Sequence, residues 1–184
     1  TGGSLKVKSQ VKEDKVDPLA LFKNIRKKHK VVEDLKDLDI PKFGSETLSE
    51  FVMLPHFNFF YEGITPQTQE LFRIGYDPRD DRIVIPHFNY DDKNAIVGIT
   101  GRTLRDEEEM KTFKVPKYYN FIKGYKKMYN LYGFSHNIEY IIKDKVLIIF
   151  EAEKSVLKES SMTRNEGHGV SVGGHEISQV QVNI

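Results

Sequence analysis

The chain has 184 residues, no cysteine and a formal net charge of +1, with 28 Lys and Arg against 27 Asp and Glu. The lack of cysteine excludes disulfides and thiolate zinc sites, and the balanced charge means that any nucleic-acid binding must come from local basic patches. No apolar run approaches the length of a membrane span and no signal peptide is visible, so we expect a cytoplasmic protein with no membrane partner.

The first part of the sequence is a polar segment followed by two helix signals. Residues 1–16 hold few apolar side chains, which predicts a flexible lead-in or linker. Asp17 and Pro18 form a good helix start, with an acidic N-cap and proline at the first helical position. Residues 45–51 predict another helix. Four aromatic residues then predict core packing, and they are Phe57, Phe59, Phe60 and Tyr61.

The clearest helix signal follows directly. Thr65 is a good N-cap residue and Pro66 suits the first turn, so we expect a helix that continues through residue 72 and has ended by Gly75.

Two apolar segments around a polar turn predict a β-hairpin. The strands are residues 81–88 and 95–99, and the turn is residues 90–94. Gly98, inside the second strand, indicates a bulge or a close approach of another group to the backbone.

The middle of the chain gives weaker signals. Residues 105–111 are acidic and predict an exposed loop, and residues 136–142 predict a helix. For Tyr118 and Tyr119, core packing is favoured over stacking on nucleic-acid bases.

Glu151 is the most informative residue of the chain. Residues 145–150 are apolar and β-branched, which predicts a buried strand, and the chain then turns into a helix from Lys154. In open α/β sheets, ligands bind at the carboxyl ends of strands, so an acid at this place is exposed to chemistry. The alternative is that Glu151 only caps the helix. A strand at residues 169–172 would complete the opening half of a doubly wound parallel sheet.

Taken in order, five short motifs resemble bacterial-type DNA primases, particularly those of phages. The motifs are Arg82-Ile-Val-Ile-Pro86, Val97-Gly-Ile-Thr-Gly-Arg102, Pro116-Lys-Tyr-Tyr-Asn120, Lys127 before Leu131-Tyr-Gly133, and Phe150-Glu-Ala152 as the first motif of a toprim domain. The resemblance covers roughly residues 60 to 180.

The chain also departs from the family pattern. Ala152 replaces a glycine and Ser155 replaces an aspartate of many cellular primases, which suggests a phage variant. The zinc-binding module of the family is absent, as the lack of cysteine requires. The family's metal-binding aspartates lie further downstream, and no aspartate follows Ser155, so we expect a catalytic-core fragment truncated within the toprim domain.

The resemblance implies an α/β fold with a mixed α+β amino-terminal lobe and the first part of a toprim, Rossmann-like parallel sheet. The corresponding division is a lead-in at residues 1–16, the lobe at residues 17–143 and the partial toprim domain at residues 144–184.

The resemblance also implies a site for metal-assisted nucleotidyl transfer. Glu151 would bind Mg²⁺ or Mn²⁺ or act as a general base. The basic residues Arg82, Arg102, Lys117 and Lys127 would bind template, primer or triphosphate. His168 and His175 are rejected as a metal site.

The function implied is that of a DNA primase, a DNA-dependent RNA polymerase that makes short primers for replication. Its partners would be single-stranded DNA, ribonucleoside triphosphates and a replicative helicase, in a bacterial cell. Two alternatives stay open: a toprim metal-dependent nuclease or strand cleaver, and a non-catalytic single-strand-binding module of a replisome. The isolated chain is expected to be inactive.

Overall fold

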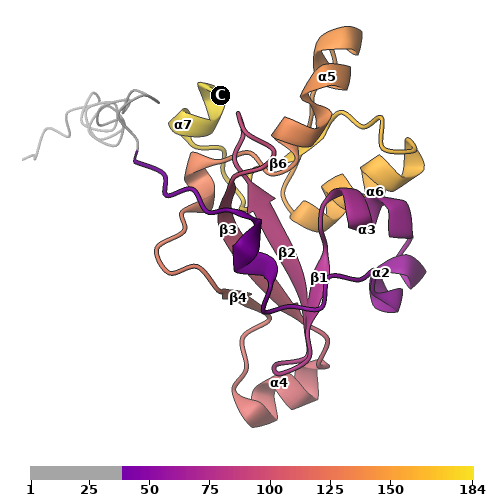
Figure 1. Cartoon of the computed structure of the whole chain (residues 1–184), viewed down its shortest axis with the longest axis vertical. Coiled ribbons are helices and arrows are strands. Elements are labelled where there is room, and N and C mark those ends of the chain that lie inside the picture. Colours follow the sequence, from indigo (N-terminus) through magenta and orange to yellow (C-terminus); the bar gives the residue numbers. More distant parts are fainter. Residues whose placement is uncertain (1–38) are drawn as a thin grey trace, which may run out of the picture. The chain divides into compact units, whose positions relative to one another are not determined.

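The computed structural model describes residues 39–184, which belong to a single compact unit (Figure 1). The predicted lead-in at residues 1–16 and the predicted helix start at Asp17 lie outside the described residues. The proposed divisions of the chain at 16/17 and 143/144 stay predictions.

The described residues form short helices and strands. The strands are β1 (Gly75–Asp77), β2 (Arg82–Phe88), β3 (Ile96–Thr103), β4 (Tyr118–Asn120), β5 (Ile148–Phe150) and β6 (Gly169–Ser171). The helices are α2 (Phe57–Tyr61), α3 (Pro66–Leu71), α4 (Glu107–Phe113), α5 (Phe134–Asp144), α6 (Glu153–Met162) and α7 (Gln179–Val182), with 3-10 turns η2 (Ser45–Leu48) and η3 (Lys127–Tyr129).

An antiparallel sheet in the order β1-β2-β3-β4 forms the centre of this unit. The predicted hairpin is confirmed as β2 and β3, which pair with Arg102 opposite Ile83 and Gly98 opposite His87. The register shifts by one residue after His87, which is a bulge. A Cβ atom on Gly98 would lie 2.3 Å from the ring of Tyr125, so the predicted close approach is also confirmed.

The two faces of this sheet pack against different segments. On one face, Ile83 and Ile85 join a core cluster with Phe59, Phe72 and Leu157, and so with α2 and α6. On the other face, a second cluster is made by Val84, Phe88, Ile96, Ile99 and Leu48, with Phe51 and Phe121 packed against it. Because side chains alternate along a strand, each residue of β2 and β3 is committed to one of these two environments.

A two-stranded parallel sheet holds β5 and β6, which α6 connects. The predicted strand–helix–strand is therefore confirmed, and with it the mixed α/β class. The prediction that β5 is buried is wrong: Ile148 and Ile149 are 38% and 51% exposed. Among residues 39–184, β5 pairs only with β6, so its other edge is open.

Two of the other helix predictions hold. Thr65 caps α3 by accepting a hydrogen bond from the Thr68 amide, with Pro66 in the first turn. The helix expected near residues 136–142 is α5. Residues 45–51 give only the short turn η2.

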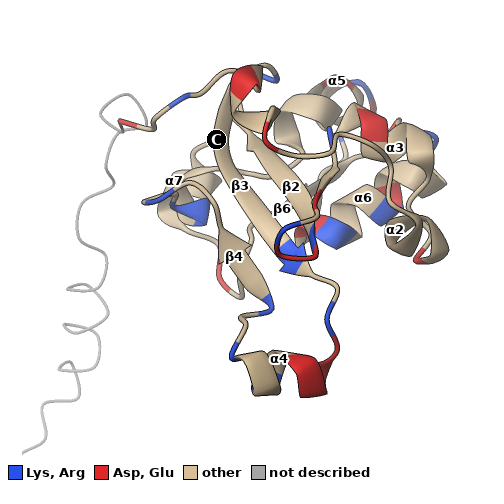
Figure 2. Cartoon of the chain, turned by 60° about the horizontal axis from the view of Figure 1, so that its bottom comes forward, with Lys and Arg blue, Asp and Glu red and all other residues tan. Residues whose placement is uncertain are grey.

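The acidic segment at residues 105–111 is a helix rather than a loop. Asp106 and Glu109 form a capping box, in which each side chain accepts from the other's backbone amide. Three glutamates occupy the first turn of α4, where the helix dipole favours negative charge (Figure 2). The segment is exposed, as expected.

Two aromatic predictions are wrong. Of the four aromatics at residues 57–61, only Phe59 is buried, while Phe57, Phe60 and Tyr61 are exposed. Tyr118 and Tyr119 are 44% and 48% exposed, so neither is core. No helix among residues 39–184 is long and apolar enough to cross a membrane.

Candidate functional site

A pocket opens at the carboxyl end of β5, where Glu151 follows the strand. We name it the β5 pocket. It has a volume of about 380 Å³ and is lined by Tyr118, Asn120, Lys127, Glu151, Ala152, Glu153, Gly173, Gly174 and His175. The predicted position of Glu151, at the end of a parallel strand and outside the apolar core, is confirmed.

Glu151 is held by its backbone and leaves its carboxylate in solvent. Ser171 Oγ donates to the Glu151 carbonyl over 3.0 Å, and the Gly173 amide donates to Ser171 Oγ over 3.0 Å. The carboxylate lies 2.9 Å from His175 Nδ1, in a pair whose side chains are 62% and 89% exposed. The N-cap of α6 is Ala152 with no side-chain cap hydrogen bond, so the helix-cap alternative for Glu151 has no support.

Lys127 enters the same pocket and pairs with a buried carboxylate. Its Nζ atom lies 2.5 Å from Glu153 Oε1, and the Glu153 side chain is only 5% exposed. The ammonium also lies 5.9 Å from the centre of the Tyr118 ring. Burial opposes ionisation of Glu153, but His87 and Lys127 together lower its pKa. The pair thus places one fixed cation at the wall of the pocket.

A buried histidine lies behind this pair. His87 Nε2 is 3.1 Å from Thr100 Oγ1 and 3.5 Å from Glu153 Oε1, and His87 Nδ1 is 2.8 Å from the Tyr125 hydroxyl. Burial lowers the pKa of His87 to about 4, against the raising effect of Glu153. The imidazole is therefore neutral near pH 7. Burial also raises the pKa of Tyr125, which keeps its hydroxyl protonated.

A second pocket lies beside β4, and we name it the β4 pocket. It has a volume of about 370 Å³ and is lined by Asn58, Glu62, Arg102, Thr103, Leu104, Arg105, Asp106, Glu107, Met110 and Lys117. Arg102 Nη1 lies 3.1 Å from Glu62 Oε1, and Glu62 also accepts from Lys154 of α6. Burial opposes ionisation of Glu62, but these two cations lower its pKa.

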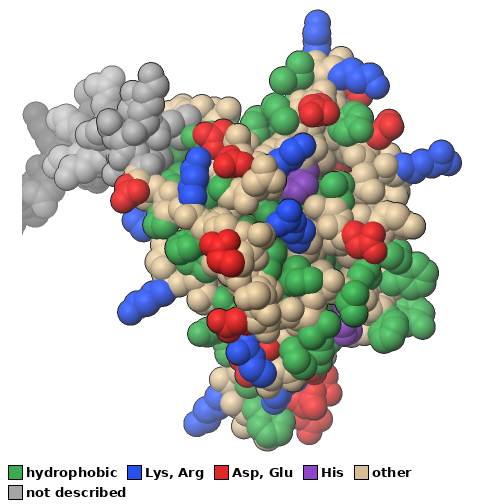
Figure 3. Space-filling view, viewed as in Figure 1, with side chains coloured by type: hydrophobic (Ala, Val, Ile, Leu, Met, Phe, Trp, Pro, Cys, Tyr) green, Lys and Arg blue, Asp and Glu red, His purple; other side chains and the backbone are tan. Residues whose placement is uncertain are grey.

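The two pockets adjoin along β4. Lys117 lines one pocket and the next residue, Tyr118, lines the other, while Arg102 pairs with Tyr118 in the sheet. Three of the four predicted basic residues, Arg102, Lys117 and Lys127, therefore line these two pockets, and of these only Lys127 shares its pocket with Glu151. On the face shown in Figure 3, basic and acidic side chains are interspersed.

Arg82 requires a correction. It is 3% exposed, and both of its terminal nitrogens donate to the Pro116 carbonyl over 3.1 Å. It pairs with Thr103 in the sheet, whereas Arg102 pairs with Ile83, so the two arginines lie on opposite faces. The guanidinium of Arg82 is inside the fold and is not available to a phosphate.

Sequence reasoning missed Glu153 and His87. Glu153 had a usable signal, because it shares the helical spacing i, i+3, i+4, i+7 with the buried residues Val156, Leu157 and Ser160. The burial of His87 had no comparable signal, because both faces of β2 are covered.

The described residues do not form a closed metal site. In residues 39–184, no group of three or more His, Asp or Glu side chains could hold an ion. Glu151 is an exposed carboxylate, but Glu153 is occupied by Lys127 and His87. A single carboxylate fits only a loosely held hard cation that keeps waters or phosphate oxygens as its other ligands.

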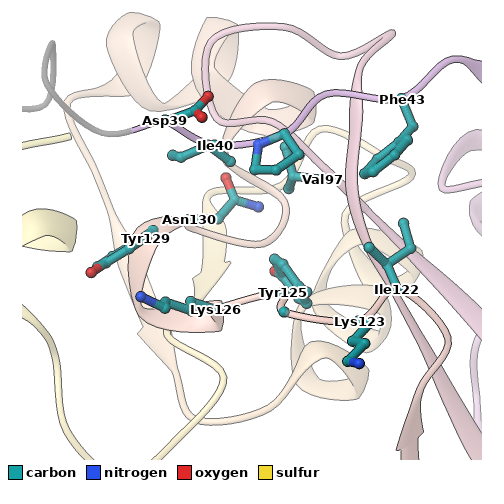
Figure 4. A pocket seen from close by; sticks show the side chains of 12 residues that line it. Asp39, Ile40, Phe43, Val97, Ile122, Lys123, Tyr125, Lys126, Tyr129 and Asn130 are labelled. Atoms are coloured by element: carbon teal, nitrogen blue, oxygen red, sulfur yellow. The ribbon is translucent and has the colours of Figure 1, made fainter.

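A third cavity of about 240 Å³ lies elsewhere and contains none of the predicted residues (Figure 4). Ile40, Phe43 and Val97 are among its apolar walls, and Lys123 and Lys126 are its cations. One of its lining residues, Tyr125, is bonded to His87, which lies behind the Lys127–Glu153 pair.

Comparisons with known proteins agree with the fold. No family model matches the chain. The SPbeta prophage-derived uncharacterized protein YorJ of Bacillus subtilis is 34% identical over 152 residues, which is 80% of this chain and 38% of that protein. The chain thus spans well under half the length of this relative.

Solved structures of similar fold are primases. The Aquifex aeolicus primase, in a structure of its zinc-binding and RNA polymerase domains, matches 68% of this chain and 38% of that chain, with a TM-score of 0.57 and 22% identity. The RNA polymerase domain of Mycobacterium tuberculosis DnaG matches 68% of this chain and 49% of that chain, with a TM-score of 0.53 and 15% identity. The described part of this chain therefore has the fold of a bacterial primase catalytic core.

Proposed function

We propose that the chain is part of a phage-type DNA primase and that its two adjoining pockets bind single-stranded DNA and a ribonucleoside triphosphate. The observation that carries the proposal is that Lys127 lines the β5 pocket with Glu151, while Arg102 and Lys117 line the β4 pocket beside it. A DnaG catalytic domain of similar fold, with a TM-score of 0.50, is described as bound to single-stranded DNA. The M. tuberculosis domain is described in complex with DNA bearing a 6-nucleotide overhang.

Each residue has a role that its environment allows. The three cations would bind backbone or triphosphate oxygens, and this binding would depend on salt. Tyr118 has an exposed ring at the pocket wall and would stack on a base.

Glu151 would act on the reacting end of the primer. Its carboxylate would accept a proton from a 3′-hydroxyl or contribute one ligand to Mg²⁺ or Mn²⁺. When bound, such an ion would neutralise charge on the phosphate oxygens. The fit is partial, because Glu151 is an exposed acid with no second free acid beside it in the pocket.

The chain spans less than half the length of the proteins that it matches, so the complete activity is also a proposal. We propose that primer synthesis and coupling to a replicative helicase require more than the described residues provide. The chain alone would bind DNA and make no primers.

A second candidate is a non-catalytic single-strand-binding module. The small number of free carboxylates in the β5 pocket favours it. The two candidates predict the same binding residues and differ in catalysis.

The test measures binding of a fluorescent 12-nucleotide oligothymidylate. Lys117→Gln and Lys127→Gln together should weaken binding by about 30-fold or more, at roughly one charged contact each. The control is Lys143→Gln, which removes an exposed cation of α5. Equal effects of all three changes would contradict the proposal. Template-dependent incorporation of labelled ribonucleotides by the chain alone would contradict the expectation that it makes no primers.

A further inference from the structure

The pair of Lys127 and Glu153 is an unusual arrangement for a phosphate-binding lysine. Lys127 is 26% exposed in its side chain and Glu153 is 5% exposed, so the acid lies inside the fold and the cation at its border. A buried acid is costly unless it is paired. Glu153 therefore depends on its pair with Lys127. The role of this pair rests on the proposed binding of phosphates by the β5 pocket.

The remaining contacts fix the direction of the lysine stem. A Cβ atom on Gly173 would lie 2.8 Å from Lys127 Cδ, so the stem passes directly against the turn after β6. Gly173 has a φ of +68°, which also favours glycine there. The Tyr118 ring lies on the β4 side of the ammonium. The stem is thus confined while the ammonium reaches the pocket.

Behind Glu153, His87 limits where the carboxylate can go. A neutral imidazole carries one N–H. Tyr125 can donate its hydroxyl proton to Nδ1, which leaves Nε2–H to donate toward Thr100 and Glu153. The carboxylate is held from behind by a group that is itself fixed.

We propose that Glu153 is a positioning residue, which holds the Lys127 ammonium at the wall of the β5 pocket for contact with a phosphate. Glu153 itself touches neither nucleotide nor template. The alternative is that it is merely a negative charge near an anion-binding pocket, and the two roles predict opposite signs.

The first experiment measures binding of the fluorescent oligothymidylate at fixed salt without divalent metal. Glu153→Gln should weaken binding about 10-fold, the loss of one charged contact, although it removes a negative charge. Lys127→Gln should weaken it by a similar factor, and the double variant should bind like Lys127→Gln alone. Tighter binding by Glu153→Gln in both backgrounds would overturn the proposal. Glu139→Gln, an exposed acid on α5, controls for net charge.

The second experiment does not depend on DNA binding. Reductive methylation with labelled formaldehyde, followed by mass spectrometry, gives a rate for each lysine. Lys127 should react several-fold more slowly than Lys143, and Glu153→Gln should remove this protection. Equal methylation rates of Lys127 and Lys143 in the chain without substitutions would overturn the proposal. If neither Lys127→Gln nor Glu153→Gln changes DNA affinity, the proposed function of the pocket fails, and the methylation rates alone decide the Glu153 assignment.

Discussion

Two arginines on neighbouring strands of the β1–β4 sheet lie on opposite faces, and their environments differ. Arg82 points into the face packed against residues 48–51 and 121, where it donates to the Pro116 carbonyl. Arg102 points into the other face and reaches the rim of a pocket. The arginine of β2 stabilises the fold and the arginine of β3 is a candidate for binding, because successive side chains of a strand point to opposite faces.

The face that carries Arg102 changes in character from one strand to the next. Ile83 and Ile85 of β2 lie in the core cluster beneath α6, whereas Tyr118 and Asn120 of β4 line the β5 pocket. The sheet therefore changes from apolar to polar toward β4, which is where the site lies.

The largest expected effect concerns His87, on the face that carries the site. Its pKa is about 4 in the folded chain against 6.5 when unfolded. The unfolded chain therefore binds more protons between these values, and stability falls as pH decreases from about 6.5 to about 4. At about 1.4 kcal/mol per pKa unit, the loss is roughly 3 kcal/mol.

Urea unfolding at several pH values measures this loss. His87→Gln should reduce the pH dependence of the unfolding free energy in that range. His136, whose pKa is also lowered to about 4, would contribute to the part that remains. An undiminished slope in His87→Gln would show that the histidine is not neutral in the fold.

Arg82→Met should cost about 2–3 kcal/mol of unfolding free energy, because it leaves the Pro116 carbonyl without its donor. Arg102→Gln should cost less than about 1 kcal/mol, since its pair with Glu62 is partly exposed. Chemical denaturation of the two variants compares them directly. Equal losses of unfolding free energy in the two variants would contradict the assignment of Arg82 to the interior and Arg102 to a pocket.

Gly98→Ala should cost about 1–3 kcal/mol, since the added Cβ would require the Tyr125 ring to move. Gly174→Ala is the matched control, because nothing lies within 4 Å of the added Cβ there. Thermal unfolding of both variants would show whether the close approach at Gly98 matters.

Arg102→Gln should weaken single-stranded DNA binding by about 10-fold and lower the salt slope by about one. Titrations at several salt concentrations provide both values. An unchanged slope would give Arg102 a structural role with Arg82.

The smallest effect is expected for Glu151→Gln. Its carboxylate is exposed, so both unfolding free energy and DNA affinity should change by less than about 0.5 kcal/mol. In a longer protein capable of synthesis, the same change should abolish primer synthesis. A large loss of stability would show that Glu151 is structural.

The sequence predicted the elements better than the roles. Thr65 with Pro66, the β2–β3 hairpin and the strand before Glu151 carry local signals, and all three are present. The acidic α4 was missed because its capping box outweighs its polar composition. Arg82 was misassigned because its face depends on the strand register, which no local pattern reveals. The burial of Glu153 could be predicted from its helical spacing with Val156 and Leu157, because that face of α6 packs on the core.

The most direct test of the account is an NMR titration of the labelled chain with the oligothymidylate. We expect the amide signals of Arg102, Lys117, Tyr118, Asn120 and Lys127 to shift on binding, while those of Leu48, Phe51 and Val84 on the other face do not. Shifts confined to the face of Leu48 and Phe51, or no binding at all, would contradict the placement of a nucleic-acid site at the end of β5.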